Sequence, residues 1–248
     1  TPQFILAQPL LVENFEFSGL LIDNGWAVTS AGAGAIGTTA GLSYTDYPGS
    51  GVGNAAAVDS NGQDVNRQFT SQTSGNIYFS FLANVKSGTA GYFAHLGTGT
   101  STFAARFFVK PSTTAGKINF GLSNTSTGVY AAVPTDYDTS TTYLVIVKYE
   151  VSTTGNTSFW VVPAGIPSSE VAAGTPEVTT SGTGQTTISG FYLRQYSATQ
   201  NITVDGIRVA TAWEDLFALP AGPALSVFPA TLSGFSYPVT TGGPSASQ

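Results

Sequence analysis

Cysteine and methionine are both missing from this 248-residue chain, and His95 is its only histidine. Without cysteine there are no disulfides, no thiolate metal sites and no thiol nucleophile, so stability has to come from a buried core. Charged residues make up only 9% of the sequence, against about 25% in ordinary soluble domains. The chain is therefore poor in the side chains that cross-link, bind soft metals or titrate.

Positive charge is scarce as well. The sequence has 8 Lys and Arg residues against 14 Asp and Glu, a net charge of -6. The basic residues are scattered and form no stripe that could follow a phosphate backbone, so we predict no nucleic-acid binding. The longest strongly apolar stretch, Tyr143 to Val147, is far shorter than the roughly 20 residues of a membrane helix, so we predict no membrane insertion.

The chain begins with Thr1 and contains no methionine. We therefore expect either that a leader has been removed or that the sequence is a piece of a longer protein. A removed secretion signal is the explanation that we favour. It predicts a secreted, extracellular or cell-surface protein.

Glycine is abundant, and apolar side chains alternate with polar ones through much of the chain. Every second side chain from Asn76 to Val85 is apolar, as in a strand with one buried face. Similar segments recur at Phe103 to Lys110, Lys117 to Leu122 and Thr142 to Val151, the rhythm of a sandwich or barrel. About a dozen such segments are too many for a seven-strand immunoglobulin domain. The pattern predicts an all-β, two-sheet antiparallel jelly-roll sandwich over residues 1–218.

The stretch Asn201 to Phe217 is predicted to hold the strand that closes this sandwich. Its apolar side chains change parity at Asp205-Gly206, which is what a β-bulge at glycine would produce. An apolar face can then stay inward on both sides of the bend. Trp213, Leu216 and Phe217 follow with helical spacing, and we expect them to cap the open end of a core.

Several motifs carry a family resemblance. They are LLVENFEF at Leu10 to Phe17, NGW at Asn24 to Trp26, the glycine-rich Gly41 to Val58, QDVNRQF at Gln63 to Phe69, and VDGIRVATAWEDL at Val204 to Leu216. Together they resemble the concanavalin A-like, laminin-G-like jelly-roll modules of secreted Bacteroidetes-type surface proteins. The resemblance spans almost all of the predicted domain, and its motifs are structural in kind.

This resemblance implies a fold and a setting. It implies that an N-terminal strand at Leu11 to Phe17 pairs with the closing strand at Asn201 to Val209. It also implies a non-catalytic extracellular or cell-surface module for binding or adhesion, directed at a carbohydrate or another extracellular ligand.

An enzyme is the less favoured alternative. Glycoside hydrolases of related folds place two glutamates and an aspartate at alternating positions of one strand, so that the carboxylates face one cleft. Here Glu13 and Glu16 have opposite parity and Glu150 stands alone. His95 has no carboxylate near it in the sequence, so we interpret it as a structural residue.

A carbohydrate ligand would need aromatic faces that stack on C–H groups and planar polar groups that bond hydroxyls. Tyrosines on β-sheets also serve ordinary cross-strand packing, and both interpretations stay open at this stage. The candidates for ligand binding are Tyr44, Tyr47, Tyr130, Tyr137, Tyr192, Arg194 and Tyr196.

Calcium is the one cofactor that the sequence suggests. The turn from Asp59 to Asp64 is rich in oxygen ligands of the kind that Ca²⁺ takes, and Asp59, Asn61 and Asp64 are the candidate ligands. Its spacing is not that of an EF-hand, and such turns are also common without a metal. Asp136 and Asp138 form a weaker second candidate.

The character of the chain changes after residue 218. Residues 219–224 are predicted to be a linker, and Leu225 to Phe235 alternates and contains a proline, as edge strands do. Residues 225–248 resemble the start of an immunoglobulin-like module but are too few to form one. The alternative function is therefore structural: a subunit of an extracellular assembly or filament, joined through this strand to copies of itself or to neighbouring surface-protein modules.

Overall fold

The computed structural model describes residues 8–218, which form two antiparallel β-sheets packed face to face. Along one sheet lie β13 (Val178–Thr180), β12 (Thr157–Val162), β11 (Thr142–Glu150), β6 (Asn76–Ser87), β15 (Asn201–Ala210), β4 (Asn54–Val58) and β3 (Gly37–Ala40), with β1 (Leu11–Glu13) also paired to β15. The other contains β10 (Tyr137–Asp138), β9 (Lys117–Ser123), β8 (Ala104–Pro111), β7 (Gly91–Gly97), β14 (Ile188–Leu193), β5 (Asp64–Gln72) and β2 (Ala27–Ser30). The predicted two-sheet jelly-roll sandwich is confirmed.

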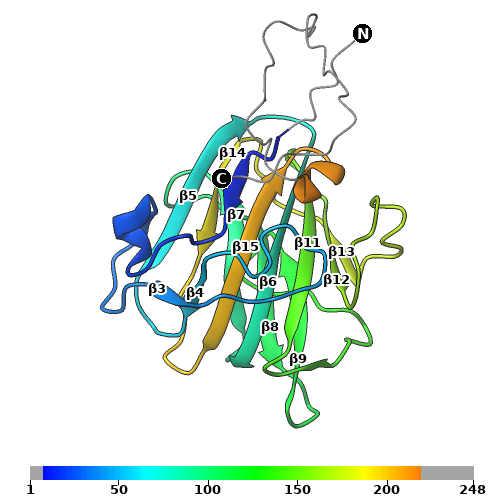
Figure 1. Cartoon of the computed structure of the whole chain (residues 1–248). Coiled ribbons are helices and arrows are strands. Elements are labelled where there is room, and N and C mark those ends of the chain that lie inside the picture. Colours follow the sequence, from blue (N-terminus) through cyan, green and yellow to red (C-terminus); the bar gives the residue numbers. More distant parts are fainter. Residues whose placement is uncertain (1–7, 219–248) are drawn as a thin grey trace, which may run out of the picture. The chain divides into compact units, whose positions relative to one another are not determined.

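β15 lies inside the eight-stranded sheet, between β6 and β4 (Figure 1). β1 pairs with the second half of β15, with Leu11 opposite Val209. The predicted pairing between the two ends of the domain is therefore confirmed. Most neighbouring strands in this sheet are far apart in the sequence, so its hydrogen bonds link the first segment of the described chain to the last.

The predicted bulge is also present in β15. The register of β15 against β6 shifts between Asp205 and Arg208, and Gly206 has a φ of 56°. Ile202 and Val204 before the bulge and Ile207 and Val209 after it are all buried in the same core. The extra residue therefore restores the inward face, because side chains on a strand alternate with a period of two.

β1 is shorter than the strand predicted at Leu11 to Phe17. It ends at Glu13, and Phe15 has a φ of 51°, outside the extended region. The buried Glu13 carboxylate accepts hydrogen bonds from Phe15 N at 2.9 Å and from Trp26 Nε1 at 3.0 Å. These bonds turn the chain inward, so that Phe15 is fully buried and stacks on the Trp26 ring.

The main core lies between the two sheets. The stripe predicted on β6 is buried, and Phe81 from this stripe packs edge-to-face against Phe93 on β7 and Phe107 on β8, with centroid distances of 6.0 and 5.5 Å. Such contacts join the sheets through apolar area and ring geometry, with no cross-link required.

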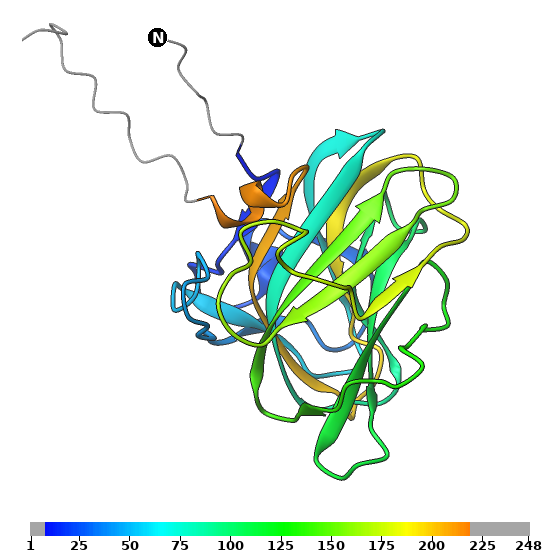
Figure 2. The ribbon, with the colours of Figure 1, turned by 90° about the vertical axis from the view of Figure 1, so that its right-hand side faces the viewer.

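A second apolar cluster covers the outer face of the eight-stranded sheet. It includes Leu144, Ile146, Trp160 and Trp213. Trp213 precedes η2 (Glu214–Phe217), which lies beside the end of β15 (Figure 2). Trp213 and Leu216 are buried in this second cluster, and Phe217 packs against it. They contact the outward side chains of β6, β11 and β12 and not the core between the two sheets.

The contacts within the chain divide it after Ala218. The predicted linker at 219–224 and the strand segment at 225–248 lie outside the described residues, and so does the function proposed for them. A second short helix, η1 (Leu21–Asn24), precedes β2. Within residues 8–218 no helix has the length and apolar character needed to cross a membrane.

Replacing Gly206 with alanine tests the importance of the bulge. A Cβ at Gly206 would lie 2.9 Å from Cε1 of the buried Tyr47 ring, whereas a Cβ at Gly75 would meet nothing within 4 Å, although both glycines have positive φ. We expect each Ala substitution to cost about 1 kcal/mol for its backbone, and Gly206→Ala to cost about 1–3 kcal/mol more for the clash. Urea unfolding of both variants measures this, and equal losses would contradict the expectation.

Candidate ligand-binding pocket

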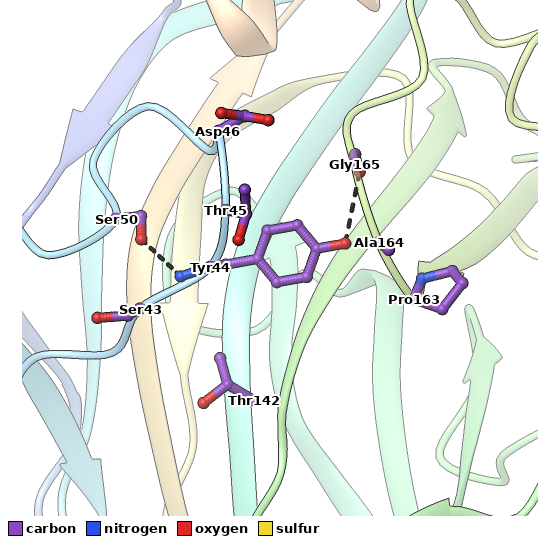
Figure 3. A pocket seen from close by; sticks show the side chains of 9 residues that line it. All are labelled: Ser43, Tyr44, Thr45, Asp46, Ser50, Thr142, Pro163, Ala164 and Gly165. Carbon is purple, nitrogen blue, oxygen red and sulfur yellow. Dashed lines mark hydrogen bonds between the residues drawn. The ribbon is translucent and has the colours of Figure 1, made fainter.

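A cavity of about 550 Å³ lies on the outer side of the eight-stranded sheet (Figure 3). One wall comes from the glycine-rich loop between β3 and β4, and the other comes from the segment that follows β12. Thr142, the first residue of β11, also lines it. The lining residues are Ser43, Tyr44, Thr45, Asp46, Ser50, Thr142, Pro163, Ala164 and Gly165.

Tyr44 reaches from one wall to the other. Its hydroxyl donates a hydrogen bond to Val162 O at 2.8 Å, and its backbone N–H donates to Ser50 Oγ at 2.5 Å. The side chain is half-buried, and burial raises the pKa of its hydroxyl. Tyr44 therefore stays neutral at physiological pH and presents an uncharged ring to the cavity.

The rest of the lining is polar. Ser43, Thr45, Ser50 and Thr142 bring hydroxyl groups, and Asp46 brings the one carboxylate among the lining residues. Hydroxyls both donate and accept hydrogen bonds, and a carboxylate accepts them. Together with the Tyr44 ring, this set can bond the hydroxyls of a small polar ligand and pack against its C–H surface.

Three buried side chains hold the glycine-rich loop in place. The Asp205 carboxylate accepts a hydrogen bond from Leu42 N at 2.7 Å, and Arg208 Nε donates to Pro48 O at 2.8 Å. The Tyr47 hydroxyl donates to Gly206 O at 2.6 Å and lies 2.8 Å from Ser80 Oγ. Tyr47, a predicted ligand-binding residue, is only 3% exposed and does not line the pocket.

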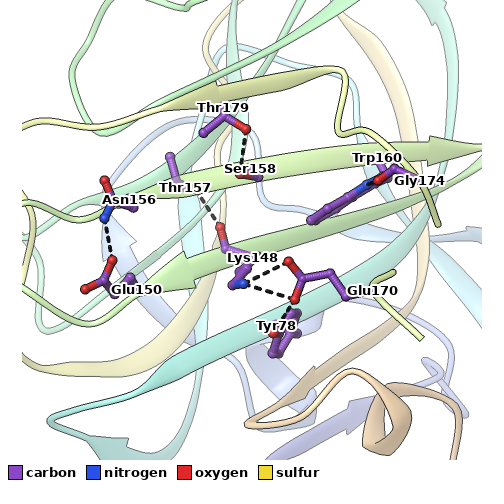
Figure 4. A network of polar contacts seen from close by, with 10 residues as sticks. All are labelled: Tyr78, Lys148, Glu150, Asn156, Thr157, Ser158, Trp160, Glu170, Gly174 and Thr179. Carbon is purple, nitrogen blue, oxygen red and sulfur yellow. Dashed lines mark hydrogen bonds and ion pairs between the residues drawn. The ribbon is translucent and has the colours of Figure 1, made fainter. Parts of the chain in front are cut away.

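A polar network fastens the opposite loop (Figure 4). The Glu170 carboxylate accepts two hydrogen bonds from Lys148 Nζ, at 2.8 and 3.0 Å, and one from the Tyr78 hydroxyl at 2.7 Å. Burial alone would raise the pKa of Glu170, but these bonds hold it below its usual value. Trp160 Nε1 donates to Gly174 O at 2.9 Å, so the loop is tied down at two points.

Four of the other predicted ligand-binding residues lie elsewhere, around the seven-stranded sheet. Tyr192 is buried and stacks on the His95 ring, with 4.6 Å between centroids. The Arg194 guanidinium lies 5.4 Å from the Tyr196 ring, and Lys110 Nζ lies 4.0 Å from the Tyr130 ring. The sequence candidates therefore fall into separate groups, and Tyr44 is the one that lines the large pocket.

Tyr137, the remaining candidate, lines a second cavity of about 440 Å³. Its hydroxyl donates to the Glu177 carboxylate at 2.5 Å, and its ring packs against Phe120 and Tyr143. Burial is the main cause that raises the pKa of Tyr137, and the Glu177 carboxylate raises it further. The Tyr137 hydroxyl is thus already engaged within the protein.

Of the three predicted calcium ligands, the Asp64 carboxylate already accepts a hydrogen bond within the protein. Asp64 Oδ1 accepts a hydrogen bond from Gln195 N at 2.9 Å, and Asp59 N–H donates to Gln195 Oε1 at 3.3 Å. Asn61 is exposed between them in the sequence. Within residues 8–218 no cluster of three or more His, Cys, Asp or Glu side chains could hold a metal ion, so calcium at this turn stays a prediction.

The second acidic pair is engaged too. Asp136 accepts hydrogen bonds from Ser112, Thr114 and Asn119, which lower its pKa. Asp138 forms an ion pair with Lys117, with 2.6 Å between Oδ1 and Nζ. Both carboxylates fasten the turn around β10.

His95 is buried, and its Nδ1 lies 2.8 Å from Leu96 O. Burial lowers its pKa to about 3, so the ring is neutral at physiological pH.

Sequence reasoning did not single out Arg208, whose partners are the carbonyl groups of Pro48 and Ala218. The signal that was available is its place within the VDGIRVATAWEDL motif, three residues after Asp205.

No protein-family model matches this sequence, and no curated protein matches it. Among solved structures, it is similar to an alginate lyase mutant in complex with an alginate tetrasaccharide, at 14% identity over 82% of this chain and 98% of that chain, with a TM-score of 0.44. It is also similar to the globular domain of T. cruzi calreticulin, at 10% identity over 84% of this chain and 91% of that chain, with a TM-score of 0.48. A carbohydrate-binding module from Bacillus subtilis is similar at 10% identity over 75% of this chain and 95% of that chain, with a TM-score of 0.37. The fold assignment here depends on the strand order and register, not on these similarities.

Asp205 makes the stability of the folded protein dependent on pH. Burial raises its pKa to about 6, and Glu13 adds to the rise, while the N–H groups of Leu42 and Gly206 lower it. An aspartate in an unfolded chain titrates at about pH 3.9. Between these values only the folded state binds the proton, so this residue stabilises the protein increasingly as the pH falls from about 6 to about 4.

We expect Asp205→Asn to remove this pH dependence. The stability of the wild type relative to the variant should rise on acidification through that window, by no more than about 3 kcal/mol. Urea denaturation of both proteins at a series of pH values measures the difference. A difference that stays constant with pH would contradict the assignment.

Proposed function

We propose that this chain is a non-catalytic module that binds carbohydrate through the Tyr44 pocket. The observation that carries the proposal is the composition of that pocket: one aromatic ring, four hydroxyl side chains and one carboxylate around about 550 Å³. A sugar ring presents an apolar C–H face and a rim of hydroxyls, and this lining complements both. An extracellular or cell-surface location and a role in adhesion follow the sequence resemblance to secreted surface modules.

The absence of catalysis is part of the proposal. Hydrolysis of a glycosidic bond ordinarily needs two carboxyl groups on opposite sides of the bond. Asp46 is the one acidic residue in the lining, and the Tyr44 hydroxyl is already hydrogen-bonded to the backbone. The pocket therefore has the groups to hold a sugar and lacks the second carboxylate of a glycosidase.

The side chains at the pocket allow a direct test by glycan array and titration calorimetry. We expect Tyr44→Ala to weaken binding by about tenfold or more, because it removes the stacking surface. Tyr44→Phe keeps the ring and should retain most of the affinity. Val133→Ala, at a side chain that is 88% exposed and outside the pocket, is the control.

Two outcomes would contradict the proposal. One is that the wild type binds no glycan, and the other is that Tyr44→Ala binds as well as the wild type while folding normally. Release of new reducing ends or unsaturated products from a bound glycan would overturn the non-catalytic assignment instead.

A further inference from the structure

Aromatic rings and guanidinium groups alternate on the seven-stranded sheet. The Arg194 guanidinium lies 4.2 Å from the centre of the Tyr92 ring, and the Arg106 guanidinium lies 5.1 Å from the same ring. Arg106 also lies 4.3 Å from the centre of the Phe103 ring. These residues come from β7, from β8 and its approach, and from the segment after β14. They bring two positive charges within reach of one tyrosine.

These cations have no carboxylate partner at ion-pair distance. Within residues 8–218 the ion pairs are made by Arg67, Lys117 and Lys148. Asp64 interacts electrostatically with Arg194 from a distance. In a chain with 14 acidic and 8 basic residues, two guanidinium groups beside one tyrosine ring without an ion-pair partner create a local excess of positive charge.

Arg106 also lines a cavity of about 310 Å³. Its Nη1 donates to Asn124 O at 2.9 Å, while its Nε is buried without a hydrogen-bond partner. Burial lowers its pKa, and Tyr92 opposes that effect, but a guanidinium stays charged at physiological pH. The cavity is thus lined by a charged guanidinium whose Nη1 bonds the backbone and whose Nε is buried.

The rest of this cavity is uncharged. Phe103 contributes a ring, and Thr125, Ser126, Thr183 and Gln185 contribute hydroxyl and amide groups. Asn124 lines it too, but its side chain is committed to the protein: Nδ2 donates to Gly155 O at 2.6 Å and to Gly182 O at 3.0 Å. The wall beside Arg106 is therefore held rigidly.

We infer that this Arg106 cavity binds an anionic sugar residue of an acidic polysaccharide. The guanidinium donates to the carboxylate or sulfate oxygens, since planar forks of N–H groups match such anions. The C–H face of the sugar packs on Phe103, and the hydroxyl and amide side chains bond its remaining hydroxyls. Arg194, which also lies beside the Tyr92 ring, extends the positive surface toward a neighbouring residue of the same polymer.

The inference is independent of the Tyr44 pocket, because the two cavities share no lining residue and belong to different parts of the fold. It also predicts a property that a neutral sugar site lacks. Because charge contributes to the affinity, added NaCl should weaken the binding, as screening reduces electrostatic attraction.

Affinity electrophoresis and titration calorimetry at low salt test it with two polyanions and their neutral counterparts. Polygalacturonate carries carboxylates, and its methyl ester is the uncharged control. Dextran sulfate carries sulfates, and dextran is its uncharged control. We expect the wild type to bind at least one polyanion about tenfold or more tightly than its neutral counterpart. Binding to only one of the two polyanions identifies the anionic group that the cavity accepts.

Arg106→Gln keeps a side-chain amide and removes the charge, and we expect it to lose about tenfold or more in affinity for the polyanion. Lys86→Gln removes the same charge from an exposed side chain outside the cavity and should change the affinity by less than about twofold, as a surface charge contributes little. Arg106→Lys should recover part of the loss. Tyr44→Ala should leave this binding unchanged, which separates the two sites.

The inference is overturned if the wild type binds neither polyanion, or if Arg106→Gln and Lys86→Gln have equal effects. It is also overturned if Tyr44→Ala abolishes polyanion binding while Arg106→Gln preserves it. Thermal unfolding of each variant shows whether a lost affinity reflects a lost fold, and Arg106→Lys remains informative if Arg106→Gln does not fold.

Discussion

The buried carboxylate of Asp205 and the bulge at Gly206 are the constraint on which the Tyr44 pocket depends. A carboxylate removed from water needs hydrogen-bond donors, and Asp205 finds them in the backbone of Leu42 and Gly206. Gly206 in turn offers its carbonyl to Tyr47. One bulge in a central strand therefore restores the inward parity of β15. It also ties the loop between β3 and β4 to the outer surface of the sheet.

The two sheets of the sandwich use their outer faces differently. Loops cover the outer face of the eight-stranded sheet and pack their apolar side chains against it, so the candidate site there is a pocket between loops. On the seven-stranded sheet, Tyr92, Arg106 and Arg194 come from strands or the segments next to them. A ligand in the Arg106 cavity would meet one strand residue, Arg106 on β8, whose place is set by the strand register, and side chains from the loops around it.

Local pattern was sufficient for much of the fold and insufficient for the sites. The phase change at Asp205-Gly206 predicted a bulge, because strand side chains alternate with a fixed period. The same reasoning could not separate Tyr44 from Tyr47, which are three residues apart in one glycine-rich loop. Tyr44 lines the pocket and Tyr47 is buried outside its lining. That difference depends on hydrogen bonds to Val162, Ser80 and Gly206.

The sequence by itself determined the all-β class and the stripe of apolar residues on β6, because both depend on the alternation of apolar and polar side chains. It also indicated the pairing of the two ends of the domain, because its motifs resemble those of a known jelly-roll family. Only the tertiary structure decided which polar side chains meet. Arg106 and Arg194 are 88 positions apart in the chain, yet both lie within 5.1 Å of the Tyr92 ring centre. Contacts of that kind arise from the order and register of strands in a sheet, which no local stretch of sequence contains.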